Sequence, residues 1–479
     1  MQIQCHRFQE RCSEALLDEN LQKALAGIKA TLASRRNEAF AALADAEELR
    51  ERAHRIKCAT FSSLDEHLQR LEREVTQQGG RVHWAETAGE AREIIENLAL
   101  RNKVRTVVKG KSMTSEEIGL NEGLAGRGLD VFETDLGEFI IQLAGEPPSH
   151  IVGPAIHKTK EQVSRLFSEK LNVERLDDPR EMTMLARRVL RRRFLDADMG
   201  ITGANFAVAD TGGIVLFENE GNIRLTTSLP RIHVALMGIE KVIPGLDDLH
   251  VMMQLLARSC TGQKLPTYVS MIHGPKGPRD RDGAEQFHLV ILDNGRSRIL
   301  ADDDLSETLF CIRCGACLNI CPVYLHVGGH AYGWVYSGPI GAILTPQLLR
   351  GKTTSQLPYA STLCGACAEV CPVKIDIPAI LVALRQRYAE NPAWPGTASS
   401  FERAVFAFFG RLLQHREAYE RAARFAGWLQ SPVARLLAVA GRRVSSGILE
   451  AVRNAPPLAR RSFYREWKSG NRRTRRRRL

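Results

Sequence analysis

The sequence predicts an α/β fold, with a parallel sheet covered by helices on both faces, joined to a small α-helical module. Two observations support this prediction. From Arg81 onward, short apolar runs alternate with helical stretches, which is typical of successive βαβ units. Further along the chain, seven of the eleven cysteines lie in two short runs, 311–321 and 364–371, which indicates a separate module.

The first 78 residues are expected to form a helical region. They are rich in Ala, Leu, Glu and Arg, and apolar residues such as Leu16, Leu21 and Ile28 recur at helical spacing. Gly79 and Gly80 then interrupt the pattern. We therefore place the first boundary at residue 78.

Residues 79–300 are expected to form the α/β domain. Its helices are expected at 87–100, 115–124, 159–171, 179–195 and 246–257. Its strands are expected at 82–84, 106–108, 129–132, 151–152, 206–209, 214–217, 232–237, 268–272 and 287–292. A tight turn at Thr211-Gly212-Gly213 should join the fifth and sixth of these strands.

The glycine-rich segment from Gly200 to Asn222 does not read G-x-G-x-x-G. A dinucleotide-binding site is therefore not predicted from it. Its glycines either allow a ligand to approach the backbone or form hairpins, and physical reasoning alone favours hairpins.

The first cysteine run reads C-x2-C-x2-C-x3-C-P, the spacing of bacterial two-cluster ferredoxins. In that pattern three thiolates bind one iron-sulfur cluster and the fourth binds the other. The expected ligands of the first cluster are Cys311, Cys314, Cys317 and Cys371. Those of the second are Cys321, Cys364 and Cys367. Structural zinc and disulfides both fit this spacing poorly.

The second set is one thiolate short, because Ser361 stands where the spacing requires a cysteine. Three outcomes remain open: a 3Fe-4S cluster, a 4Fe-4S cluster with an oxygen or water ligand such as Ser361, or a ligand supplied by a partner. We favour two 4Fe-4S clusters, the second with one unusual ligand. The module is expected to span residues 301–395.

Residues 396–458 are expected to form a C-terminal helical region, and 459–479 an Arg-rich, disordered tail. The tail from Arg460 carries nine Arg, one Lys and one Glu, so it accounts for +9 of the net charge of +11. A charge run of this kind is usually a solvated end, so nucleic-acid binding is not expected and membrane contact is at most peripheral. With no signal segment and no spanning apolar run, a cytoplasmic protein is expected.

Several motifs together resemble the lactate utilization protein B family, and the resemblance covers almost the whole chain. Most of these motifs lie in the α/β domain, and the last of them lie in the cysteine module. The motifs are Lys109-Gly-Lys-Ser-Met113, Glu133-Thr-Asp-Leu-Gly-Glu138, His150-Ile-Val-Gly-Pro154, the Gly200 to Asn222 segment, Arg224-Leu-Thr-Thr227, Leu229-Pro230, His233, both cysteine runs and Gly328-Gly-His-Ala-Tyr-Gly333.

The resemblance implies a LUD domain, with a Rossmann-like three-layer fold similar to sugar-phosphate isomerases and CoA transferases, followed by a ferredoxin-type module. It also implies an iron-sulfur subunit in the oxidation of L-lactate to pyruvate. Such a subunit would relay electrons from a cysteine-rich partner, alongside a smaller LUD-domain subunit, to an acceptor. The chain would then be the electron-transfer component of a complex rather than a stand-alone enzyme.

Two other functions are open. The α/β domain could itself be catalytic, with Glu133, Asp135 or Glu138 as the base in acyl or isomerase chemistry, because carboxylates at strand ends of a parallel sheet are well placed for that. Alternatively, the chain could be an iron-sulfur protein that binds nucleic acid through its Arg-rich tail. The sequence contains no flavin fingerprint and no defensible lactate site.

Overall fold

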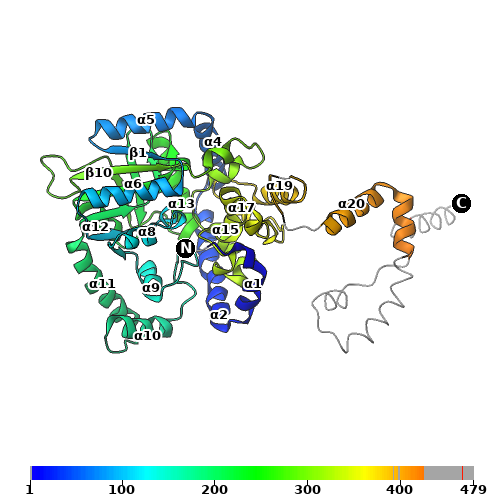
Figure 1. The fold of residues 1–479 in the computed structure, drawn as a ribbon, viewed down its shortest axis with the longest axis horizontal. Coiled ribbons are helices and arrows are strands. Elements are labelled where there is room, and N and C mark those ends of the chain that lie inside the picture. The colour runs from blue at the N-terminus through cyan, green and yellow to red at the C-terminus, as the bar shows by residue number, and fades with distance from the viewer. Residues whose placement is uncertain (1–2, 392, 397–399, 426–466, 468–479) are drawn as a thin grey trace. The chain divides into compact units, whose positions relative to one another are not determined.

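In the computed structural model, the chain divides into two units, Met1–Gly396 and Thr397–Leu479 (Figure 1). The structure describes residues 3–391, 393–396, 400–425 and 467. The second unit contributes the helix α20 (Ser400–Gln414). The predictions for residues 426–458 and for most of the Arg-rich tail lie outside the described residues. The boundaries proposed at residues 78 and 300 lie within the first unit and stay predictions.

The N-terminal region is helical, as predicted. It consists of η1 (Cys5–Arg7), α1 (Phe8–Leu17), α2 (Glu19–Ile28), η2 (Lys29–Ala33), α3 (Ser34–Ala41), α4 (Ala46–Ser62) and α5 (Leu64–Gln77). The last of these helices buries Leu64, Leu68, Leu71 and Val75 on one face, at the spacing of an amphipathic helix.

The centre of the first unit is a six-stranded sheet whose paired strands are all parallel, in the order β1-β10-β7-β4-β2-β3. Its strands are β1 (Arg81–Ala85), β2 (Thr106–Lys109), β3 (Asp130–Glu133), β4 (Met199–Thr202), β7 (Ile232–Gly238) and β10 (Gln286–Leu292). β4 and β7 are buried along their whole length, as expected for central strands covered on both faces.

Alternating residues of these strands enter different cores, which confirms the predicted three-layer α/β fold. Leu289 and Ile291 of β10 pack with α5 on one face, whereas Val290 and Leu292 pack with α6 (Ala88–Arg101) on the other. Figure 1 shows α5 and α6 on opposite sides of β1 and β10. Successive side chains of a strand point to opposite faces of the sheet. Because helices cover both faces, the sequence of each strand is expected to be apolar throughout.

The remaining helices of this domain cover the sheet or connect its strands. They are α7 (Met113–Glu117), α8 (Leu120–Gly126), α9 (Leu136–Ala144), α10 (Lys160–Leu171), α11 (Pro179–Asp196), α12 (Asn222–Ser228), η3 (Ile239–Lys241), α13 (Leu246–Thr261) and α14 (Arg296–Leu300). Val108 of β2 packs in a core with residues of α9, α10 and α11, while the adjacent Val107 packs in the core of α6.

A second, four-stranded sheet has the order β8-β5-β6-β9. Its strands are β5 (Phe206–Val208), β6 (Gly213–Glu218), β8 (Val242–Ile243) and β9 (Tyr268–Ile272). β5 and β6 form the predicted antiparallel hairpin. Gly212 in its turn has φ +66°, a conformation that favours glycine. The glycine-rich segment therefore does form a hairpin.

The cysteine module consists of short helices, as predicted. They are η4 (Ser306–Phe310), α15 (Ala316–Ile320), α16 (Tyr324–Val327), η5 (His330–Tyr332), α17 (Gly338–Leu349), η6 (Lys352–Thr354), η7 (Leu357–Tyr359), α18 (Ala366–Glu369) and α19 (Ile377–Glu390). The N-terminal region packs on this module: the Gln4 N–H donates to Gly333 O at 2.8 Å, and the Arg50 guanidinium donates to Glu369 O and Cys371 O.

Two predicted elements differ from the structure, and two strands were not predicted. Residues 151–152 are not a strand, because the N–H groups of Val152 and Gly153 donate to His150 Nδ1 in a turn and cannot join a sheet. The helix predicted at 115–124 is divided into α7 and α8 at Gly119, which has φ +62°. β4 and β8 were not predicted, because four residues containing a glycine and a two-residue strand give no clear periodic pattern.

No helix in the described ranges is both long enough and apolar enough to cross a membrane.

Gly200 in β4 should not tolerate a side chain. A Cβ atom built on it would lie 1.9 Å from the carbonyl oxygen of Thr226 in α12, and main-chain atoms cannot move aside as a side chain can. We predict that Gly200→Ala lowers the free energy of unfolding by about 1–3 kcal/mol, the usual range for overpacking. Urea denaturation followed by circular dichroism measures the change.

Gly126, at the end of α8, is the matched control, because a Cβ on it meets nothing within 4 Å. Gly126→Ala should leave stability unchanged or raise it slightly. Equal losses in the two variants would contradict the proposed contact between β4 and α12.

Candidate functional site

Four of the predicted ligands surround one apolar cavity. Cys311, Cys314 and Cys317 come from the loop between η4 and α15 and from α15 itself, while Cys371 follows α18. All four line one small space together with isoleucine and valine side chains. Gly315 has φ +75°, which lets the chain turn sharply into α15 between two of these cysteines. We call these four cysteines the first thiol set.

The other three predicted ligands form a second thiol set: Cys321, Cys364 and Cys367. Burial is the main cause that raises the pKa of Cys367, to about 12, and Cys321 and Cys364 are close enough to contribute to the rise. Cys321 and Cys367 are buried, but Cys364 is exposed. The second thiol set therefore reaches the surface, whereas Cys314, Cys317 and Cys371 of the first are buried.

The first thiol set has the form that an iron-sulfur cluster requires. No group of three or more His, Cys, Asp or Glu side chains in the described part of the chain is arranged to hold one metal ion. In an iron-sulfur cluster each thiolate binds its own iron, so the sulfurs surround a space and need not converge on a point. An apolar cavity ringed by four thiols has this form.

Burial raises the pKa values of three thiols of the first thiol set. The pKa of Cys371 rises to about 11, and those of Cys314 and Cys317 rise well above the ordinary thiol value. Without metal these thiols stay protonated at neutral pH. Iron binds thiolates, so a cluster held here would have to displace the protons of these thiols.

Several cations surround the first thiol set. Arg36 lies close enough to Cys314 and Cys371 for their charges to interact, and the Arg50 guanidinium donates to Cys371 O at 2.9 Å. Lys57 and Lys241 are buried and interact electrostatically with Cys311. Main-chain N–H groups also donate to sulfur, from Arg313 to Cys311 and from Ile375 to Cys371, each at 3.4 Å.

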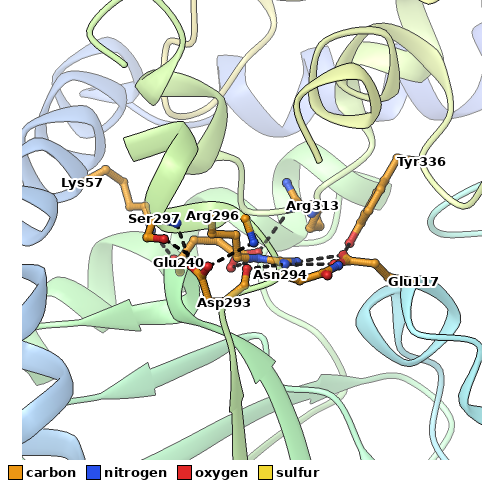
Figure 2. Close-up of polar contacts among 10 residues, drawn as sticks. Lys57, Glu117, Glu240, Asp293, Asn294, Arg296, Ser297, Arg313 and Tyr336 are labelled. Carbon is orange, nitrogen blue, oxygen red and sulfur yellow. Dashed lines mark hydrogen bonds and ion pairs between the residues drawn. The ribbon is translucent and has the colours of Figure 1, made fainter. Parts of the chain in front are cut away.

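A buried charge network connects this loop to the sheet (Figure 2). Glu240, which follows β7, lies between two arginines: Arg296 Nε is 2.7 Å from its Oε2, and Arg313 Nη2 is 3.3 Å from its Oε1. Arg296 also pairs with Glu117 at 2.8 Å. The Tyr336 hydroxyl donates to Glu117 at 2.6 Å.

The network fixes the ionisation of its members. Burial by itself would raise the pKa of Glu240, but Arg296, Arg313 and Lys241 lower it to about 2. The Glu240 main-chain oxygen also accepts a hydrogen bond from Lys57 Nζ at 2.8 Å. Because buried charges are costly unless paired, these contacts hold the sheet edge and the first cysteine loop in one relative position.

The three carboxylates considered as a catalytic base have different roles in the structure. Glu133 is buried and paired with Lys109 at 2.8 Å, and Asp135 caps α9 by accepting from two main-chain N–H groups. Glu138 is buried, and burial with the nearby Glu133 raises its pKa to about 8. Glu138 therefore combines burial with a pKa near neutrality, and burial also raises the pKa of Glu133.

Ser361 is already engaged in a local turn. Its Oγ accepts from the N–H of Leu363 at 3.1 Å, and its carbonyl oxygen accepts from Arg385 at 3.2 Å. The two histidines between the cysteine runs are also satisfied locally: His326 contacts Pro322 O and His330 contacts Pro147 O.

Sequence reasoning missed the charged residues around the first thiol set. Arg313 stands inside the first cysteine run, and its position between two ligands was a signal that a charge would lie at the cluster. Arg296, Glu240 and Lys57 gave no such signal, because they are distant in sequence and charged residues are usually exposed.

Two family models and several curated relatives match this chain. Residues 68–292 match the LUD domain, and residues 307–375 match the 4Fe-4S dicluster domain. Lactate utilization protein B from Bacillus licheniformis is 44% identical over 433 residues, which is 90% of each chain. The protein of the same name from Bacillus cereus is 41% identical over 478 residues, covering 98% of this chain and 99% of the relative. A solved DUF162 family protein from Deinococcus radiodurans covers 48% of this chain and 98% of its own, at 13% identity with a TM-score of 0.27.

Removing the central cation of the network should be costly. Arg296→Met would leave Glu117 and Glu240 buried with fewer partners, and breaking a buried ion pair typically costs about 3–5 kcal/mol. We predict a loss of this size in the free energy of unfolding by urea.

The pKa of Glu240 in the folded protein lies below its ordinary 4.5, so its stabilisation is present above pH 4.5 and is lost as the pH falls towards 2. The variant should lose less stability over this acid range.

The control is Arg7→Met, which removes an Arg–Glu pair of the same length, to Glu10, whose side chains are 40% and 57% exposed. A surface pair contributes less than about 1 kcal/mol. Equal effects of the two substitutions would contradict the role given to the buried network.

Proposed function

Since the chain belongs to the lactate utilization protein B family, we propose that it relays electrons from the oxidation of L-lactate to an acceptor through two iron-sulfur clusters. The observation that carries this proposal is the grouping of the seven cysteines into one set around a common cavity and a second set that reaches the surface. Iron-sulfur clusters transfer single electrons, and their potentials depend on net charge, hydrogen bonds and exposure.

We propose Cys311, Cys314, Cys317 and Cys371 as the ligands of the first cluster. The cavity that they line together supports this set. The ferredoxin spacing also supports it, because in that pattern the last cysteine of one run binds the cluster held by the other run. The nearby cations Arg36, Arg50 and Arg313 would offset the negative charge of a cluster held by four thiolates.

Cys321, Cys364 and Cys367 are the proposed ligands of the second cluster. The mutual influence of these thiols supports the set. For the fourth position we propose a non-cysteine ligand, such as Ser361 after release of its turn, in a 4Fe-4S cluster. A 3Fe-4S cluster or a ligand from a partner are the other outcomes of the test below.

The second cluster is proposed as the one that exchanges electrons with another protein. Cys364 is exposed, and Tyr359 and Leu363 beside it are 57% and 37% exposed. The first thiol set lies deeper, against the sheet edge. The family resemblance suggests a cysteine-rich subunit and a smaller LUD-domain subunit as partners.

Substitutions in the two thiol sets should remove different clusters. After anaerobic reconstitution we expect about eight iron and eight sulfide per chain, as two 4Fe-4S clusters require. Cys314→Ser and Cys367→Ser should each lower the iron content to about half, and each should remove a different paramagnetic signal. Iron and sulfide assays with electron paramagnetic resonance measure both effects.

Cys58→Ser is the control, because Cys58 is an exposed thiol outside both sets. Unchanged iron in Cys314→Ser, or loss of iron in Cys58→Ser, would contradict the ligand assignment. Ser361→Cys should change the signal of the second cluster alone, and an unchanged signal would show that position 361 is not at that cluster.

The relay itself predicts that lactate-dependent reduction of a dye needs more than this chain. We expect activity when the cluster-loaded chain is combined with the other subunits of the lactate system, and none from the chain alone. Cys367→Ser should lower the combined activity severely, while Cys58→Ser should leave it unchanged. Dye reduction with L-lactate by this chain alone would refute the relay.

A further inference from the structure

A second cavity lies where the carboxyl ends of β2 and β4 meet the first cysteine loop. It has a volume of about 300 Å³. Lys111 follows β2 by two residues, Gly203 and Asn205 follow β4, and Arg313 comes from the cysteine loop. The carboxyl ends of parallel strands are the usual place for ligands in α/β folds.

Two cationic side chains of this cavity each have a nitrogen atom without an acceptor. Within the residues that the structure describes, Lys111 Nζ and Arg313 Nη1 are buried and make no hydrogen bond. The side chain of Arg313 is only 8% exposed. A buried donor without an acceptor costs about 1–3 kcal/mol, and more when it is charged. Two such donors lining one cavity indicate that an anionic ligand belongs there.

The carboxylates of the same cavity are already engaged. Asp135 accepts from two main-chain N–H groups of α9, and Glu218 accepts from two of α12 at 2.7 and 3.0 Å. Glu220 accepts from Leu136 N at 3.2 Å. These carboxylates therefore accept hydrogen bonds that hold loops in place. Lys111 Nζ and Arg313 Nη1, by contrast, are donors without an acceptor.

The charges around this cavity leave one cation without a partner. Burial and the neighbouring Asp135 raise the pKa of Glu220 to about 7, so this carboxyl is partly protonated at neutral pH. Arg313 and Lys241 lie beside the ionised Glu240, whereas Lys111 Nζ makes no hydrogen bond within the described residues. A bound monoanion would give Lys111 the negatively charged partner that it lacks.

The lining selects a small organic acid over inorganic phosphate. Leu216, Phe217, Leu256 and Ile151 supply an apolar wall, which suits a carbon body. Three carboxyl groups line the same cavity and would repel a phosphate dianion. A monocarboxylate with a short carbon chain satisfies both conditions.

This cavity adjoins that of the first thiol set. Ile151 and Arg313 line both. The N–H of Arg313 donates to Cys311 Sγ at 3.4 Å, while its side chain reaches the second cavity and Glu240. A charge bound at Arg313 therefore lies beside the proposed first cluster.

We propose that this cavity binds a small organic monocarboxylate through Lys111 and Arg313, and that the bound negative charge lowers the reduction potential of the first cluster. The second part rests on the proposed function, because it requires a cluster in the first thiol set. The site would make electron relay responsive to the acid that the system processes.

Binding is tested by calorimetry on the cluster-loaded full chain, with L-lactate and pyruvate as probes. L-lactamide is the uncharged control and inorganic phosphate the alternative anion. We expect at least one carboxylate to bind, the amide not to bind, and phosphate to bind more weakly. Absence of binding by both carboxylates, or tighter binding of phosphate, would overturn the proposal.

Lys111→Gln should weaken carboxylate binding about tenfold or more, since it removes a charge-assisted contact. Lys111→Arg should retain most of the affinity. The matched control is Lys160→Gln, because Lys160 is an exposed lysine at the start of α10. Iron content and thermal unfolding establish that each variant is folded and loaded. Wild-type affinity in a folded Lys111→Gln protein would overturn the assignment.

A redox titration followed by electron paramagnetic resonance separates the site from a purely structural cavity. The saturating carboxylate should shift the midpoint of the first cluster to a lower potential and leave that of the second nearly unchanged. By linkage, the reduced protein should bind the carboxylate more weakly. No shift despite binding would overturn the coupling. Loss of the cluster itself, seen in the iron assay, would instead count against the proposed function.

Discussion

The arrangement of the first unit depends on the buried ion pairs of Glu240. This carboxylate follows a fully buried strand of the parallel sheet and contacts Arg296 of the same domain and Arg313 of the first cysteine loop. A buried charge is stable only when its partners are fixed, and removal of one partner leaves the other uncompensated. The α/β domain and the cysteine module are therefore not independent bodies joined by a linker, because their charges are shared.

The shared charges hold the first cysteine loop at the carboxyl ends of the sheet strands. Ligands of parallel α/β sheets bind at the carboxyl ends of the strands, and here that edge is covered by a proposed cluster loop. Arg313 lines both the thiol cavity and the neighbouring cavity with Lys111. The second thiol set, by contrast, includes an exposed cysteine. The proposed electron path thus connects a buried cluster, beside the ligand cavity, with one at the surface.

Burial has opposite effects on the pKa values of the buried thiols of the first thiol set and of the lysines beside them. It raises the pKa of Cys371 to about 11 and lowers the pKa of Lys57 to about 7. Without metal, this region holds neutral thiols beside cations of which some are partly deprotonated. A bound cluster would place negative charge beside these cations. Cluster assembly and the folding of this region should therefore be coupled.

The sequence by itself determined the α/β fold, the hairpin of the glycine-rich segment and the grouping of cysteines into a ferredoxin-type module. These features depend on local periodicity and fixed spacing, which a single chain displays directly. It did not reveal β4, the turn at His150 or the division of the helix at Gly119, because tertiary hydrogen bonds and one glycine conformation decide them. Nor could it place Lys57, Glu240 and Arg296 beside Arg313. Only the tertiary structure decided that, because a charged residue is buried when a distant partner is brought to it, and no local pattern records that partner.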